Sequence, residues 1–216
     1  MFTGTDIVTW MLANRDILIE QAIQHLNIAL TGLFVGVILW GTAGVIIHRY
    51  DRFSDVTLGV FGVILTIPSL ALLSMLIPLV GIGIPAAVTA LVLYSALPVA
   101  RNVYVGLGNV DESSVEVGRG LGMTDRQILL RVRFPQAMSV IMAGIRQAAV
   151  LLVAITTITA FFGAPGLGQS IFRGISLGNT EQIMGGAIAI SAIAILVDAS
   201  LYGVQRLLPG NEMSNT

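Results

Sequence analysis

Long apolar stretches separated by short polar connections dominate the pattern of this chain. Five of these stretches are almost free of charge and reach about 18 residues or more, enough for a helix to cross a hydrocarbon core of about 30 Å. We expect these helices near Ile23–Ile47, Leu58–Leu79, Ile84–Val105, Ala137–Phe162 and Gln182–Leu207. Because five such stretches follow one another, the pattern predicts an all-α membrane protein with about five transmembrane helices.

The segment before these stretches, residues 1–22, has a mixed character. Asp6 and Asp16 interrupt it and no basic region precedes an apolar run, so we expect mature sequence rather than a cleaved signal peptide. Its apolar side includes Trp10, which suits the headgroup region of a membrane. We therefore predict an external interfacial helix here, with a flexible lead-in as the alternative, followed by a transmembrane domain over 23–207.

The arginines indicate the orientation of the helices. Most lie at or between those ends of the predicted spans that share one side: Arg49, Arg52, Arg101, Arg119, Arg126, Arg131, Arg133 and Arg206. The opposite side keeps only Arg15 and Arg173. Because basic residues favour the cytoplasmic side, we expect a multi-pass protein of the cell (inner or cytoplasmic) membrane with its N-terminus outside. Residues 208–216 are then a cytoplasmic tail.

Composition agrees with this class and excludes several functions. The chain is 55% hydrophobic and 11% charged, with a net charge of −1 and no long charged tract that would indicate a nucleic-acid partner. All eleven basic residues are arginine, so a phosphate-binding loop that needs lysine cannot form. Without cysteine there is no disulfide or iron–sulfur cluster, and His25 and His48 are too far apart for a local metal motif. We therefore expect no catalytic activity, no metal and no cofactor in this chain.

The largest polar region between the spans is Asp111–Pro135. It predicts a short helix from Glu112 or Ser113 to Leu121, a break at Gly122, and a second helix that starts near Thr124 and runs toward Pro135. Candidate N-caps are Asp111, Ser113 and Thr124. Such a helix-break-helix forms a compact projection that can fit a groove on a partner and pass its movement to the attached spans.

At these residues the chain resembles the permeases of binding-protein-dependent ABC importers. Their cytoplasmic loop reads E-A-A, three residues, Gly, nine residues, then I-x-L-P. Glu116, Val117 and Gly118 stand at the first positions, Gly122 at the glycine, and Val132, Phe134 and Pro135 at the closing ones. The spacing is intact, although the two alanines, the isoleucine and the leucine are replaced. The resemblance implies the type I importer permease fold, with the loop 111–135 contacting an ATPase through Glu116, Gly118, Arg119, Gly122 and Pro135.

Further segments resemble the osmoprotectant branch of this family, which imports glycine betaine, carnitine and choline. They are residues 66–72 (TIPSLAL), 93–98 (LYSALP) and 142–146 (MAGIR), together with 163–168 (GAPGLG), where Pro165 departs from the G-A-G-G-L-G of relatives. The resemblance implies a second permease subunit, identical or homologous, two ABC ATPase subunits that bind ATP and magnesium, and an extracellular or periplasmic solute-binding protein.

Polar residues inside the predicted spans are candidates for structure or transport. Arg146 and Asp198 lie at a similar depth, roughly 12–16 Å from the cytoplasmic border, so we expect an ion pair between the fourth and fifth spans. Candidate pathway or gate residues are Thr66, Ser69, Tyr94, Thr156, Thr157, Phe161, Pro165 and Gly166. For the hydroxyl and aromatic residues, bonding to their own helix and core packing are the alternatives. The stretch Gly163–Thr180 is predicted to fold back as a re-entrant loop, or otherwise to be solvated.

The residues leave three other functions open. The chain could be an ABC permease for another small solute, such as an amino acid or a different betaine-like compound. It could be an ion-coupled secondary transporter or channel, although that class is expected to have more spans and carboxylates near the midplane. It could also be a structural membrane anchor, which leaves the spaced loop motif unexplained.

Overall fold

The computed structural model describes residues 4–207, and in this range the chain is helical without strands. The α-helices are α1 Gly4–Ala13, α2 Arg15–Arg49, α3 Ser54–Thr66, α4 Ser69–Val80, α5 Ile84–Tyr94, α6 Ala96–Gly108, α7 Glu112–Gly120, α8 Asp125–Ile128, α9 Phe134–Thr159, α10 Gly168–Leu177 and α11 Thr180–Leu207. Short 3₁₀ turns cover Asp51–Phe53 and Ala160–Phe162, and a π-helical stretch, Leu129–Arg133, leads into α9. The predicted tail, 208–216, lies outside the described residues.

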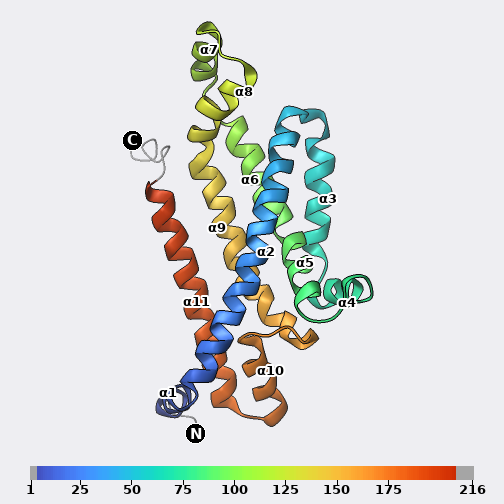
Figure 1. Ribbon diagram of the computed structural model, residues 1–216, viewed down its shortest axis with the longest axis vertical. Helices are drawn as coiled ribbons and strands as arrows, with labels where there is room; N and C mark the ends of the chain where they lie inside the picture. Colours follow the sequence, from blue (N-terminus) through green and yellow to red (C-terminus); the bar gives the residue numbers. More distant parts are fainter. Residues whose placement is uncertain (1–3, 208–216) are drawn as a thin grey trace.

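The long helices form an elongated bundle (Figure 1). Helices α2, α9 and α11 run along its long axis, and α5 followed by α6 runs beside them. Helices α7 and α8 project from one end, toward which the C-terminal end of α11 also points, while α1 and α10 cover the opposite end. The two ends of the bundle are therefore built from different segments of the chain.

The apolar helices agree with the predicted spans except for the second. Four helical segments in the described range are long and apolar enough to cross a membrane: Arg15–Arg49, Ile84–Gly108, Asp125–Phe162 and Thr180–Leu207. The prediction of one helix over Leu58–Leu79 was wrong, because the chain bends there by 100° between α3 and α4. Pro68 has no amide hydrogen and forces the residue before it out of the helical region, and Ile67 has an extended ψ of 127°.

The N-terminal region also differs from its predicted boundary. A first helix, α1, is present where an interfacial helix was expected, but α2 already begins at Arg15 rather than at Ile23. Trp10 and Met11 of α1 pack against a cluster that contains Leu18 of α2 and Ile193 of α11. Helix α1 is thus attached to the bundle by its apolar side.

Small residues allow the helices to approach closely at their crossings. A methyl group added to Gly36 of α2 would collide with Ser95, at the junction of α5 and α6. One added to Gly144 of α9 would collide with Asn102 of α6 and lie 2.7 Å from the carbonyl oxygen of Pro98. These glycines set the spacing of the central helices, as small residues commonly do in membrane bundles.

Candidate functional site

The projection formed by α7 and α8 begins with a capped helix. The carboxylate of Asp111 accepts hydrogen bonds from the backbone amide of Ser113, at 3.1 Å, and from its hydroxyl, at 2.6 Å. These bonds hold the pKa of the Asp111 carboxyl below its ordinary value, and the bond from the hydroxyl has the larger effect. Asp111 therefore acts as the expected N-cap of α7.

The second helix of the projection starts with a capping box. The hydroxyl of Thr124 accepts from the backbone amide of Gln127, and the side chain of Gln127 accepts from the amide of Thr124 at 2.8 Å. Between the two helices Gly122 has a φ of +76°, a left-handed conformation that glycine adopts without strain. The break predicted at Gly122 is present, and its cause is this turn.

The residues of the loop motif divide between an outer and an inner face. Glu116 is exposed, and the neighbouring Val117 and Leu121 are 64% and 73% exposed, so the outer face mixes charge with apolar surface. Gly118, in contrast, is buried, and a methyl group there would contact Met123, Ile128 and Val132 at 3.5–3.7 Å. Gly118 thus lets α7 pack on its own stem, while Glu116 and its neighbours remain available to a partner.

An ion-pair network ties the projection to the bundle. Glu112 pairs with Arg119 of the same helix at 3.4 Å and with Arg133 of the π-helical stretch at 3.2 Å. Arg133 also donates to the carbonyl oxygen of Leu107, at the end of α6, at 2.9 Å. The sequence pointed to Arg119 but not to Glu112 or Arg133, because their pairing joins positions that only the fold brings together.

The π-helical stretch ends two residues before the closing proline of the motif. The amide of Phe134 bonds to the carbonyl oxygen of Leu129, five residues earlier, and Pro135, without an amide hydrogen, follows at the start of α9. Helix α8, this stretch and α9 nevertheless form one helical segment, Asp125–Phe162. The projection is therefore continuous with a membrane-spanning helix.

The ion pair expected between Arg146 and Asp198 is present. The guanidinium of Arg146 donates through Nε and Nη2 to the two carboxylate oxygens of Asp198, both at 2.9 Å. It also donates to Gln205 at 3.0 Å and lies 4.7 Å from the centre of the Tyr202 ring. The bidentate pair joins α9 to α11, where the side chains are only partly exposed.

Several candidate pathway hydroxyls bond to their own helices. Thr156 is buried and donates to the carbonyl oxygen of Leu152 at 2.7 Å, and Thr66 donates to that of Val63 at 2.7 Å. Ser69 and Thr157 are half-buried on α4 and α9. The pathway role of all four stays a prediction. The observed bonds of Thr66 and Thr156 to their own helices are the ones expected if these residues serve the structure instead.

The aromatic candidates have different environments. Tyr94 is 3% exposed, and its hydroxyl donates to the carbonyl oxygen of Ile67 at 2.6 Å, at the break between α3 and α4. Phe161 is 64% exposed and contacts the rings of Phe162 and Phe172. Tyr94 thus supports a backbone break, whereas Phe161 presents a ring to its surroundings.

The segment after Phe162 folds back onto the bundle. Ala164 and Leu167 are fully buried, and Pro165 between them is half-buried. Gly166 has a φ of +137° and lies against His25 of α2, which is itself buried and hydrogen-bonded to the carbonyl oxygen of Val153 at 2.9 Å. The chain then forms α10 rather than a loop. Residues 164–168 are therefore covered by protein, while the role of this stretch as a gate stays a prediction.

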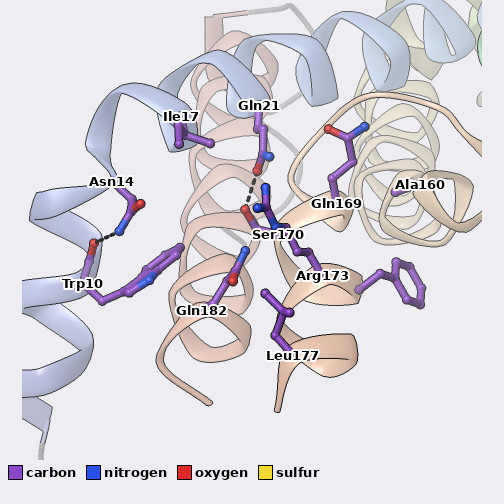
Figure 2. A pocket seen from close by; sticks show the side chains of 11 residues that line it. Trp10, Asn14, Ile17, Gln21, Ala160, Gln169, Ser170, Arg173, Leu177 and Gln182 are labelled. Atoms are coloured by element: carbon purple, nitrogen blue, oxygen red, sulfur yellow. Dashed lines mark hydrogen bonds between the residues drawn. The ribbon is translucent and has the colours of Figure 1, made fainter. Parts of the chain in front are cut away.

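A polar pocket of about 590 Å³ opens at the end of the bundle that α1 and α10 cover (Figure 2). Figure 2 shows the amide groups of Gln21, Gln169 and Gln182 around it, with Ser170 donating to Gln21 at 2.6 Å. Arg173 lies among them, and no ion pair is present for it in the range 4–207. The sequence did not indicate this pocket, because most of its residues come from four separate helices, α1, α2, α10 and α11, and share no local motif.

The architecture is that of known importer permeases. The chain superimposes on the MetNI methionine ABC transporter, in an inward-facing structure, with a TM-score of 0.81 and 20% identity over 95% of this chain and 99% of that one. An amino acid ABC transporter with histidines gives a TM-score of 0.72 at 22% identity, over 96% and 98% of the two chains. The predicted fold class, a type I ABC importer permease, is thereby confirmed.

The chain belongs to the family of binding-protein-dependent transport system inner membrane components, whose model matches residues 21–210. It is 39% identical to the carnitine transport permease protein OpuCB of Listeria monocytogenes over 94% of both chains. It is 37% identical to the choline transport system permease protein OpuBB of Bacillus subtilis (strain 168), over 94% of this chain and 93% of that one. It is also 38% identical to the osmoprotectant import permease protein OsmW of Salmonella typhimurium, over 94% and 97%.

This membership confirms the resemblance that the loop motif suggested. The chain is a multi-pass cell-membrane permease of the ABC importer type, a class that works with an ATPase and a solute-binding protein.

Proposed function

We propose that the chain forms the translocation pathway for osmoprotectants such as glycine betaine, carnitine or choline. The observation that carries this proposal is its similarity, at 37–39% identity over almost the whole chain, to permeases for carnitine, choline and osmoprotectants. An amino acid or another betaine-like solute is the alternative. The structural likeness to a methionine transporter does not favour it, because 20% identity reflects the shared fold.

The assembly that we propose contains two permease subunits, identical or homologous, around a shared axis. Two ABC ATPase subunits would bind ATP and magnesium and contact the α7–α8 projections, so that this chain performs no catalysis. The end that carries the projection and the last turns of α11 would face the cytoplasm, as the arginine distribution indicates. The opposite end, with α1, α10 and the pocket around Arg173, would then face the extracellular or periplasmic solute-binding protein.

In this mechanism the projection transmits the movement of the ATPase to the membrane helices. The exposed face with Glu116, Val117 and Leu121 would sit in a groove of the ATPase, and the turn at Gly122 allows a close approach. Closure of the ATPase pair would move α7 and α8 together, because Glu112 and Arg133 tie them to the stem. Because α8 continues into α9, this movement would reach the membrane helices and switch the pathway between outward and inward access.

Substitution of the outer face tests the coupling. In the reconstituted transporter, we expect Glu116→Ala and Gly122→Val to reduce solute uptake strongly while ATP hydrolysis continues. Gly120→Ala is the matched control, because position 120 is exposed on the same helix and a methyl group there contacts nothing within 4 Å. Wild-type uptake in both outer-face variants would argue against the projection as the coupling element.

Uptake assays with labelled solutes test the substrate class. Proteoliposomes that contain the permease with its ATPase and binding protein are expected to import betaine, carnitine or choline but not methionine. Failure of every quaternary amine would refute the osmoprotectant proposal while leaving the importer class intact. Transport that persists without the ATPase would instead indicate an ion-coupled transporter.

A further inference from the structure

A second pocket, of about 410 Å³, lies at the α7–α8 end of the molecule. It is formed between the last turns of α2 and the segment that runs from α7 through α8 into the π-helical stretch. Its lining consists of Val45, His48, Arg49, Arg119, Asp125, Arg126, Ile128, Leu129 and Arg133. Four arginines therefore converge on one cavity from three parts of the chain, with Asp125 as the acidic residue of the lining.

The positive charge of this basic pocket is only partly compensated within the chain. Arg119 and Arg133 share one carboxylate, that of Glu112, at 3.4 Å and 3.2 Å. For Arg49 and Arg126, which are exposed, no ion pair is present among residues 4–207. An anionic group would relieve the repulsion among these side chains, and the planar guanidinium fork matches the geometry of phosphate oxygens.

The apolar part of the lining distinguishes the pocket from a site for a soluble anion. Val45, Ile128 and Leu129 supply hydrocarbon next to the arginines. On the same half of α2, Ile38 and Ile46 are 52% and 53% exposed, so this helix presents an apolar surface to its surroundings. A headgroup held at the end of such a helix can extend its acyl chains along the helix, which a free phosphate cannot do.

We propose that the basic pocket binds the phosphate-bearing headgroup of an anionic phospholipid. Arg49 and Arg126 are the residues that we assign to the phosphate, while Val45 and Ile128 contact the adjoining glycerol and acyl carbons. Basic pockets between membrane helices are suited to such headgroups. The proposal requires only that α2 spans a membrane, so it stands independently of the transported solute, and the orientation decides only which leaflet supplies the lipid.

Lipid retention by the purified full-length chain tests this assignment. Native mass spectrometry in mild detergent would compare phosphatidylglycerol with phosphatidylcholine of the same acyl chains, and inorganic phosphate would serve as a competitor. We expect preferential binding of phosphatidylglycerol and a loss of roughly thirtyfold in Arg49→Gln/Arg126→Gln, at about fivefold for each arginine. The matched control, Arg52→Gln/Arg131→Gln, removes the same charge from exposed positions at the same end but outside the pocket, and should change binding less than about twofold.

Three outcomes would overturn the proposal. Equal retention of phosphatidylglycerol by both double variants would show that binding is not at this pocket. Displacement of the lipid by millimolar inorganic phosphate would indicate a soluble phosphate as the ligand. Loss of the lipid when the ATPase subunit is added, together with weaker ATPase binding by Arg49→Gln/Arg126→Gln, would assign the pocket to an acidic surface of that subunit. Unchanged thermal unfolding of both double variants would show that altered binding does not come from misfolding.

Discussion

The hydroxyl of Tyr94 in α5 donates a hydrogen bond of 2.6 Å to the carbonyl oxygen of Ile67, which lies between the end of α3 and Pro68. The bend between α3 and α4 removes the regular helical partners of the backbone at this point. A side chain from another helix supplies the missing donor, so the bend is part of the tertiary packing.

Removal of the Tyr94 hydroxyl should destabilise this bend. We expect Tyr94→Phe to lower the free energy of unfolding by about 1–2 kcal/mol, because a partly buried carbonyl loses its donor while the ring still fills its space. Thermal unfolding of the purified permease in detergent measures the change. Tyr202→Phe is the control, since its hydroxyl makes no hydrogen bond within the described part of the chain, and equal effects of both variants would refute the role of the bond.

The pair between Arg146 and Asp198 should respond differently to single and double substitution. Arg146→Gln and Asp198→Asn each leave an uncompensated charge between α9 and α11, so each should lower the unfolding temperature of the protein. The double variant Arg146→Gln/Asp198→Asn removes both charges and should be more stable than either single variant, because no charge is left without its partner. A double-mutant cycle from unfolding data measures the coupling, and additive effects would show that the pair contributes nothing as a pair.

The close approach of α6 and α9 depends on Gly144. A methyl group at this position would collide with Asn102, so we expect Gly144→Ala to destabilise the protein by about 1–3 kcal/mol. Gly203→Ala in α11 is the matched control, because a methyl group there meets nothing within 4 Å. Its unfolding temperature should be unchanged or slightly higher, and a drop equal to that of Gly144→Ala would point to a general intolerance of alanine.

The cap of α7 should depend on pH in a defined direction. Because the folded pKa of Asp111 is lowered, the contribution of its carboxylate is complete above the ordinary carboxyl pKa of about 3.9 and is lost as pH falls through the folded value. Near neutral pH, amide hydrogen exchange at the start of α7 should accelerate in Asp111→Ala but much less in Asp111→Asn, which keeps a capping oxygen. Equal protection in Asp111→Ala and the wild type would refute the cap.

The sequence determined those features whose causes are local. Apolar length predicts the spans because a helix needs about 20 apolar residues to cross the hydrocarbon core of a bilayer. The capping of α7 and α8 and the turn at Gly122 depend on side chains within a few residues of the backbone groups that they satisfy. The depth of Arg146 and Asp198 follows from counting along two helices, so their pairing was also predictable.

The tertiary structure alone decided the features that join distant parts of the chain. The bend of 100° beside Pro68 also involves Tyr94, 27 residues away from Ile67. His25 reaches the carbonyl oxygen of Val153 across 128 residues, and Glu112 meets Arg133 only because the projection folds over its stem. The basic pocket likewise combines the end of α2 with α8. No local pattern encodes such meetings, because they depend on helix crossings that side-chain packing sets.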